Sequence, residues 1–143
     1  MGAAVLFQSG TRLIGGERAS ILSAFEPITG VIIGIAFSII TLMFLGAVVL
    51  APVTEELLFR GLIFRGLYDR SPLAAHLVSM GLFSLIHVSG YVGMYDAKLL
   101  FFCFLQYLAP AYCLNFAYRQ SGSIISPILM HMATNLVAFL AMR

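Results

Sequence analysis

Long runs of apolar residues constrain this chain more than any other feature of its sequence. Residues 28–50 contain no charged side chain, and further apolar runs cover residues 73–88, 99–118 and 124–142. The first run is long enough to cross the hydrocarbon core of a bilayer as a helix. A backbone in lipid must satisfy its own hydrogen bonds, and these runs lack the alternation of barrel strands. The sequence therefore predicts transmembrane helices.

The composition agrees with an integral, multi-pass membrane protein whose surroundings are membrane lipid. Hydrophobic residues make up 61% of the chain and charged residues 10%, whereas soluble domains are about half apolar and about a quarter charged. The net charge of +2 is scattered. Without a basic stripe, nucleic acid is not an expected partner.

The predicted fold class is all-α. We expect a polytopic bundle of about four to five transmembrane helices around a polar cavity within the membrane. Residues 1–27 are mixed in character and are predicted to form an interfacial N-terminal lead-in. Residues 28–143 are predicted to form one transmembrane domain, and the sequence does not define its oligomeric state.

One segment is too long to be a single straight span. As one helix, residues 28–68 would measure about 60 Å, twice the thickness of the hydrocarbon core. We therefore expect a break or a sharp kink, most naturally at Pro52, which lacks an N–H and is tolerated at a helix start. The turn could instead come earlier and leave Pro52 as a kink within the charged helix. The connections between the later spans are predicted at 69–72, 89–96 and 119–123.

Within the apolar runs, a small set of polar side chains has no explanation in composition: Glu55, Glu56, Arg60, His87, His131 and Asn135. Ionisable groups inside a membrane are costly and mark functional sites by default. Glu56 and Arg60 are four residues apart, so they share a helix face where the arginine can neutralise the acid. Glu55 is turned about 100° from Glu56 and is left free for chemistry.

A structural interpretation of the same residues competes with this one. The ion pair could merely lock two helices together, each histidine could be a packing residue, and Asn135 could bond a neighbouring helix. Against this, three predicted helices each carry a polar patch, and one shared cavity would satisfy all of them. His76, near the start of a span, is set aside as interfacial.

The set of residue types suits peptide hydrolysis. A carboxylate can take a proton from water as general base, and an imidazole can hold that water. A second imidazole and an amide N–H can stabilise the oxyanion of a tetrahedral intermediate. Two histidines and a glutamate also match a zinc ligand set. The HExxH motif is absent, so the sequence leaves a metal unspecified.

Three short motifs carry a resemblance to a known family. "EELLFR" at 55–60, "FSLIH" at 83–87 and "HMATN" at 131–135 resemble the EExxxR, FxxxH and HxxxN motifs of the CAAX protease and bacteriocin-processing family, also called the Abi family. The resemblance covers residues 45–140. Members usually have more spans before the first motif, whereas this sequence has one predicted span there, so it is either a compact member or lacks upstream residues.

The resemblance implies an intramembrane endopeptidase that acts on a membrane-associated protein or peptide, of prenylated CaaX type or bacteriocin-like. It implies Glu55 as general base, with His87 acting on the same water. The other implied roles are an oxyanion hole of His131 and Asn135, and support from Glu56 and Arg60. Members are often called metalloproteases, and a metal here would take Glu55, His87 and His131 as ligands. A glutamate-dependent mechanism without direct metal catalysis is the interpretation that we favour.

Two other functions fit parts of the pattern. A non-catalytic membrane immunity or scaffold protein could use the same polar cluster to bind a partner. A small proton or ion carrier would explain an intramembrane glutamate near histidines, but the sequence lacks the paired repeats of many transporters. For so small a version of the family, the resemblance implies a bacterial origin, and we therefore expect the bacterial cytoplasmic membrane as its location.

Overall fold

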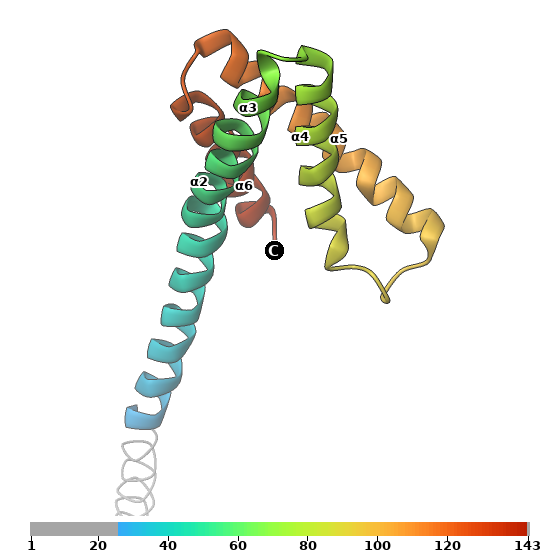
Figure 1. Ribbon diagram of the computed structural model, residues 1–143. Coiled ribbons are helices and arrows are strands. Elements are labelled where there is room, and N and C mark those ends of the chain that lie inside the picture. The colour runs from blue at the N-terminus through green and yellow to red at the C-terminus, as the bar shows by residue number, and fades with distance from the viewer. Residues whose placement is uncertain (1–25, 143) are drawn as a thin grey trace, which may run out of the picture. The chain divides into compact units, whose positions relative to one another are not determined.

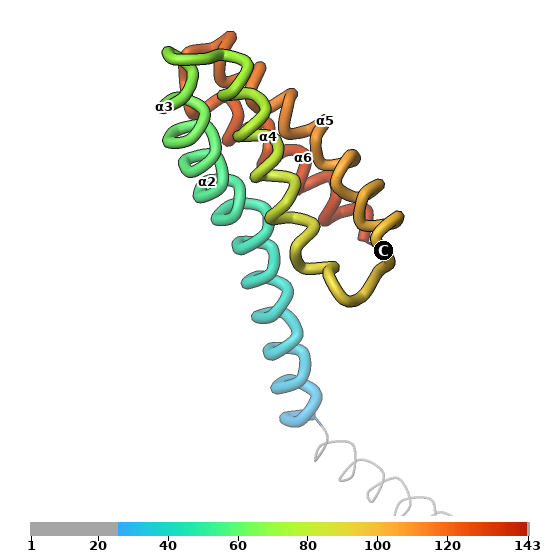
Figure 2. Tube along the Cα trace, turned by 45° about the vertical axis from the view of Figure 1, so that its right-hand side comes forward, coloured from blue at the N-terminus to red at the C-terminus, as the bar shows by residue number. Residues whose placement is uncertain are grey.

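The computed structural model describes residues 26–142, and these are almost entirely helical (Figures 1 and 2). Within this range no strand forms, and a single isolated bridge joins Val92 and Tyr95. The predicted all-α fold class is confirmed. The expected N-terminal lead-in, residues 1–27, falls almost wholly outside the described residues.

The lengths of the helices confirm an integral membrane protein. Among the described residues, three helical stretches are long and apolar enough to cross a bilayer: Glu26–Tyr68, Pro72–Ser89 and Ala97–Ser121. The last predicted span is the shorter apolar helix Ile125–Ala141. Backbone contacts divide the chain into two units, residues 1–43 and 44–143, and every motif residue lies in the second unit.

The second unit begins with helical residues that change type several times. A π-helical segment, η1 (Leu45–Leu50), leads into α2 (Ala51–Glu56). A second π-helical segment, η2 (Leu57–Phe64), follows and ends in α3 (Arg65–Tyr68). The two π-helical segments thus flank the helix that carries both glutamates, and such widened turns are frequent at functional sites.

Of the two expectations for Pro52, a break or a kink, the break is wrong. Leu50, Ala51 and Leu57 all have right-handed helical dihedral angles, so the helix continues through the proline. The physical reason is the widened turn before it, in which the N–H of Ala51 bonds the carbonyl of Gly46, five residues back. In a regular helix the proline ring clashes with the preceding turn, and a π-helical turn relieves that clash.

The later helices begin and end at residues suited to those places. Ser71 caps α4 (Pro72–Ser89) by accepting a hydrogen bond from the N–H of Ala74, and Pro72 occupies the first turn. Asp96 caps α5 (Ala97–Ser121) in the same way. The turn predicted at 119–123 begins later, because α5 continues to Ser121 and ends at Gly122, whose φ is 65°.

The helices of this unit pack around a polar centre. Helix α4 lies along α5, and α6 (Ile125–Ala141) contacts both α5 and α2 (Figures 1 and 2). The buried apolar cluster contains Phe59, Phe83, Ala111 and Leu114. The buried polar residues are Glu56, Arg60, Ser79, Ser84, Asn115 and His131. Polar groups inside and apolar groups outside are expected where the surrounding solvent is lipid.

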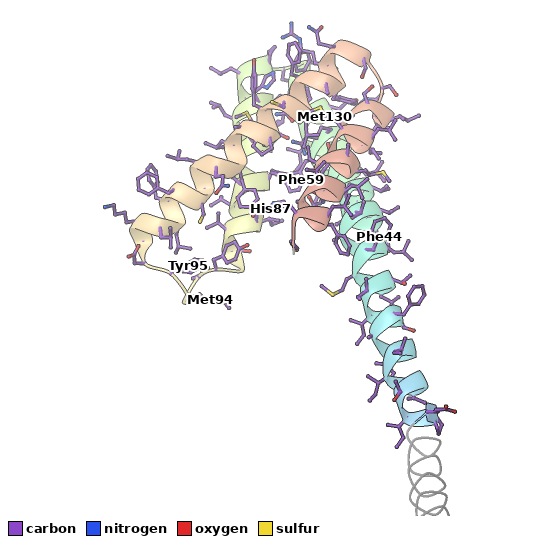
Figure 3. All side chains as sticks on the ribbon, turned by 180° about the vertical axis from the view of Figure 1, so that it is seen from behind. Phe44, Phe59, His87, Met94, Tyr95 and Met130 are labelled. Atoms are coloured by element: carbon purple, nitrogen blue, oxygen red, sulfur yellow. The ribbon has the colours of Figure 1, made fainter. Side chains whose placement is uncertain are left out.

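The predicted loop between α4 and α5 is present. It contains Met94 and Tyr95, which lie at its tip in Figure 3 and are exposed. Tyrosines are common where a protein meets the membrane surface. The buried polar residues come from the helices instead, namely from α2, η2, α4, α5 and α6. The candidate site is therefore built on helices and not on this loop.

Candidate active site

The ion pair predicted from helical spacing is present at the centre of the unit. Nη1 of Arg60 lies 3.0 Å from Oε1 of Glu56, and both residues are fully buried. Burying two charges is tolerated only when each is paired and hydrogen-bonded. Glu56 therefore stabilises the buried positive charge of Arg60, and Arg60 stabilises the buried negative charge of Glu56.

The other nitrogens of Arg60 contact α5. Its Nε donates to Oδ1 of Asn115 at 3.0 Å, and its Nη2 donates to the carbonyl of Ala111 at 2.9 Å. The guanidinium also lies over the ring of Phe83, 4.8 Å from the ring centroid. All three nitrogens thus have partners, which fixes the plane of the guanidinium.

The same carboxylate that pairs with Arg60 holds His131 of α6. Nδ1 of His131 lies 2.8 Å from Oε1 of Glu56. Because a carboxylate only accepts, Nδ1 must carry the proton in this bond. In the neutral ring, Nε2 of His131 is then a bare acceptor.

Glu55 approaches both motif histidines at the same end of their rings. Its Oε2 lies 3.7 Å from Nε2 of His87 and 3.8 Å from Nε2 of His131. These separations exceed direct hydrogen bonds, and Oε2 has no hydrogen-bond partner among the described residues. The Glu55 side chain is 25% exposed, in contrast to the sealed Glu56. The two neighbouring glutamates thus differ in environment: Glu56 is buried in an ion pair, and Glu55 is partly exposed.

His87 is held by its own helix and by two aromatic rings. Its Nδ1 lies 2.9 Å from the carbonyl of Phe83, so Nδ1 carries the proton and Nε2 is again an acceptor in the neutral ring. The rings of Phe83 and Tyr107 lie 4.3 and 4.7 Å from the imidazole, centroid to centroid. Both histidines therefore direct an unprotonated Nε2, a hydrogen-bond acceptor in the neutral ring, toward Glu55.

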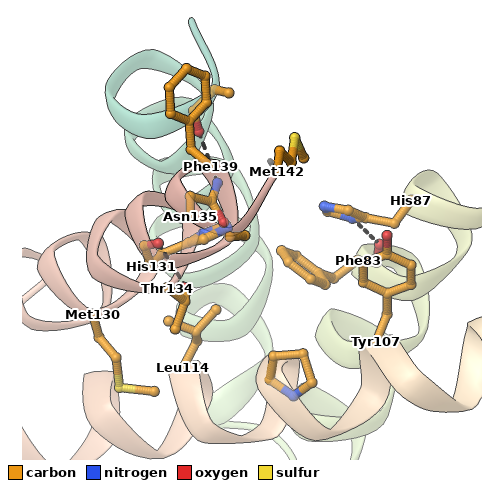
Figure 4. Close-up of a pocket in the computed structure, with 13 residues that line it drawn as sticks. Phe83, His87, Tyr107, Leu114, Met130, His131, Thr134, Asn135, Phe139 and Met142 are labelled. Atoms are coloured by element: carbon orange, nitrogen blue, oxygen red, sulfur yellow. Dashed lines mark hydrogen bonds between the residues drawn. The ribbon is translucent and has the colours of Figure 1, made fainter. Parts of the chain in front are cut away.

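A cavity of about 370 Å³ adjoins the two motif histidines, while Glu55 lies behind them and does not itself line it (Figure 4). Its polar lining residues are His87, Tyr107, His131, Thr134 and Asn135. Most of the remaining wall is apolar, including Phe83, Leu114, Met130, Phe139 and Met142. A few polar groups converging on an apolar cavity are typical of a binding site for a small molecule or peptide.

Asn135 joins this cavity one helical turn beyond His131. Its Nδ2 donates to the carbonyl of Ala47 at 2.8 Å, the bond drawn in Figure 4. A side-chain amide has two N–H groups, so one is left for another acceptor. The structure therefore brings Glu55, His87 and His131 together directly, and it places Asn135 on the cavity wall beside the two histidines.

The fit to a metal ion is incomplete. Two imidazoles with bonded Nδ1 atoms and a carboxylate are suitable zinc donors by type. Among residues 26–142, however, no three His, Cys, Asp or Glu side chains are grouped closely enough to hold a metal ion. The mechanism proposed below therefore uses no step through a metal.

The sequence interpretation missed some members of the buried network. Ser79 and Asn115 are fully buried, and the hydroxyl of Ser79 lies 3.2 Å from Oδ1 of Asn115. A polar residue inside an apolar helix is a signal that could have found Asn115. His76, set aside above as interfacial, packs between the rings of Phe64 and Tyr112, at 4.9 and 5.7 Å.

Comparison with known proteins supports the assignment made from the motifs. No curated protein and no solved structure matches the chain. The sequence does match one protein family, described as type II CAAX prenyl endopeptidase Rce1-like, over residues 36–137. This range contains all three motifs and most of the second unit. The chain therefore belongs to the type II CAAX prenyl endopeptidase Rce1-like family of intramembrane proteases.

Proposed function

We propose that this protein hydrolyses a peptide bond of a membrane-associated substrate, using a water molecule that Glu55 activates. One observation carries the proposal: Oε2 of Glu55 faces Nε2 of both His87 and His131, at 3.7 and 3.8 Å. The family match favours this function over a non-catalytic immunity or scaffold protein.

The first step is proton removal from water. A water molecule that donates one proton to Oε2 of Glu55 can donate the other to Nε2 of His87, because that nitrogen is an acceptor in the neutral ring. Both protons are then engaged and a lone pair of the water oxygen is free for attack. Glu55 takes the proton as the oxygen bonds to the substrate carbonyl carbon.

The second step is collapse of the tetrahedral intermediate. The negative oxygen of the intermediate receives a hydrogen bond from the second N–H of Asn135, whose first N–H is held by Ala47. His131 contributes when Nε2 also carries a proton, with Nδ1–H still bonded to Glu56. The C–N bond then breaks, and protonated Glu55 returns its proton to the leaving amine.

The choice of substrate class rests on the surroundings of the site. The cavity wall is mostly apolar, which suits a substrate with a lipid group or an apolar sequence. We therefore propose a prenylated CaaX-type protein or a bacteriocin-like peptide. We also propose a bacterial cytoplasmic membrane as the location, since the family that the motifs resemble includes bacterial members.

A comparison of cellular protein C-termini tests this function and identifies the substrate in the same experiment. Cells that carry wild type or Glu55→Gln are compared by mass spectrometry of the membrane fraction. The proposal expects new C-termini that require wild type and are absent with Glu55→Gln. Identical C-termini at equal expression of the two proteins would contradict it.

A further inference from the structure

A continuous chain of buried hydrogen bonds leads from α5 to the candidate site. Oδ1 of Asn115 accepts from Nε of Arg60 at 3.0 Å, and Nη1 of Arg60 donates to Glu56 at 3.0 Å. Oε1 of Glu56 then accepts from Nδ1 of His131 at 2.8 Å. Asn115 lies outside all three family motifs, yet it begins a chain that ends on a motif histidine.

The position of Asn115 explains why Arg60 points at Glu56. A guanidinium is planar, so fixing Nε by one partner and Nη2 by another fixes the direction of Nη1. Those two partners, the side chain of Asn115 and the carbonyl of Ala111, both belong to α5. The hydroxyl of Ser79 on α4 lies 3.2 Å from the same Oδ1 and also 3.2 Å from the carbonyl of Phe59, so its one proton is shared between these two acceptors.

The tautomer of His131 depends on Glu56, the last acceptor in this series of hydrogen bonds. Nδ1 carries the proton because Oε1 of Glu56 accepts from it, and Nε2 is thereby left facing Glu55 at 3.8 Å. If Arg60 turned away, Glu56 would lose the partner that fixes its Oε1. Without Arg60, the Glu56 carboxylate is no longer held against Nδ1 of His131. His131 would then be free to exchange tautomers or rotate, and Nε2 would no longer be held facing Glu55.

We propose that Asn115 is a positioning residue, which acts through Arg60 and Glu56 to hold His131 in the tautomer that directs Nε2 toward Glu55. Its importance for catalysis rests on the proposed function, whereas its effect on the His131 ring does not. Asn115 is fully buried and does not line the cavity, so it affects the site only through the residues that it bonds.

The test is made on the full chain in detergent micelles, with nitrogen-15 in its histidines. The sequence has three histidines, so the spectrum contains few signals. In wild type we expect His131 to show a proton fixed on Nδ1. In Asn115→Leu we expect exchange between tautomers or movement of the proton to Nε2. Gln106→Leu is the matched control, since Gln106 is an exposed polar residue of the same apolar helix.

Two further variants separate positioning from folding. Asn115→Gln keeps an amide oxygen acceptor for Arg60 without adding a buried charge, and its His131 signals should lie closer to wild type than those of Asn115→Leu. Ser79→Ala removes the hydroxyl shared by Asn115 and the carbonyl of Phe59, and should move the His131 signals in the same direction as Asn115→Leu, by a smaller amount. This mild variant keeps the test decisive if Asn115→Leu does not fold.

Kinetics on a fluorescence-quenched farnesylated peptide supply the second readout. Asn115→Leu should lower kcat about 10- to 100-fold with KM within about twofold of wild type, as expected for misplaced catalytic groups. Unchanged His131 signals in folded Asn115→Leu, or in Ser79→Ala if that variant alone folds, would overturn the inference. Altered signals with no peptide cleavage by wild type would instead count against the proposed function and leave the positioning role standing.

Discussion

Oε2 of Glu55 lies 3.7 Å from Nε2 of His87, with neither atom bonded directly to the other. The carboxylate comes from α2 and the imidazole from the end of α4, so packing of two helices creates the relationship. Both atoms are acceptors when the ring is neutral, and a water molecule has two protons to give them. This geometry is the physical basis of the general-base role proposed for Glu55.

His87→Phe should abolish most of the activity while preserving the fold. Phenylalanine keeps the ring between Phe83 and Tyr107 but removes the Nε2 acceptor. We expect the cleavage rate to fall about 10²-fold or more, the range for loss of a group in proton transfer. Peptide cleavage and thermal unfolding measured on the same preparation check this. A variant that cleaves at the wild-type rate would show that His87 has a packing role alone.

Asn135→Leu should lower kcat far more than it changes KM. Loss of one oxyanion donor costs about 10²- to 10³-fold in rate. Thr134→Val is the matched control, because Thr134 lines the same cavity and its hydroxyl bonds the carbonyl of His131 within its own helix. Steady-state kinetics of the two variants are compared. Equal rates for both would remove Asn135 from the oxyanion hole.

Arg60→Met should destabilise the protein strongly. It leaves the buried carboxylate of Glu56 without its cation, which costs about 3–5 kcal/mol when one partner of a buried pair is removed. The double variant Glu56→Gln/Arg60→Met should recover part of this loss, because it buries no unpaired charge. Unfolding free energies from denaturant titration in micelles check the order. A double variant less stable than Arg60→Met would contradict the account of the pair.

Gly122→Ala should cost about 1 kcal/mol of stability through backbone strain. Gly122 ends α5 with a φ of 65°, and an added Cβ there would meet nothing within 4 Å, so crowding does not contribute. Gly90→Ala is the control, because Gly90 ends α4 with a φ of −66° and is equally uncrowded. Thermal midpoints of the two variants should differ, and equal midpoints would show that the α5 cap is not strained by a side chain.

Local spacing made much of this structure predictable. The four-residue interval between Glu56 and Arg60 places them on one helix face, and they form the expected ion pair at 3.0 Å. Apolar runs predicted the later spans because a helix in lipid must be apolar on its outer face. The family motifs predicted which polar residues meet, and their catalytic roles stay predictions.

What the sequence did not yield depends on contacts between distant residues. The effect of Pro52 could not be read locally, because the π-helical turn before it removes the clash that a regular helix would suffer. The importance of Asn115 depends on how α5 packs against Arg60, 55 residues away in sequence. No local pattern encodes such a contact, although most buried polar groups have a partner; for Asn115 the partnered atom is Oδ1, while Nδ2 has none among the described residues.

The most direct test of the central claim uses purified protein in proteoliposomes with a farnesylated CaaX peptide and a bacteriocin-like precursor peptide. Products are identified by mass spectrometry for wild type and for Glu55→Gln, which should fold normally because Oε2 of Glu55 makes no hydrogen bond among the described residues. The account predicts cleavage of at least one peptide by wild type and a rate at least about 10²-fold lower with Glu55→Gln. Equal cleavage by the two proteins would contradict it.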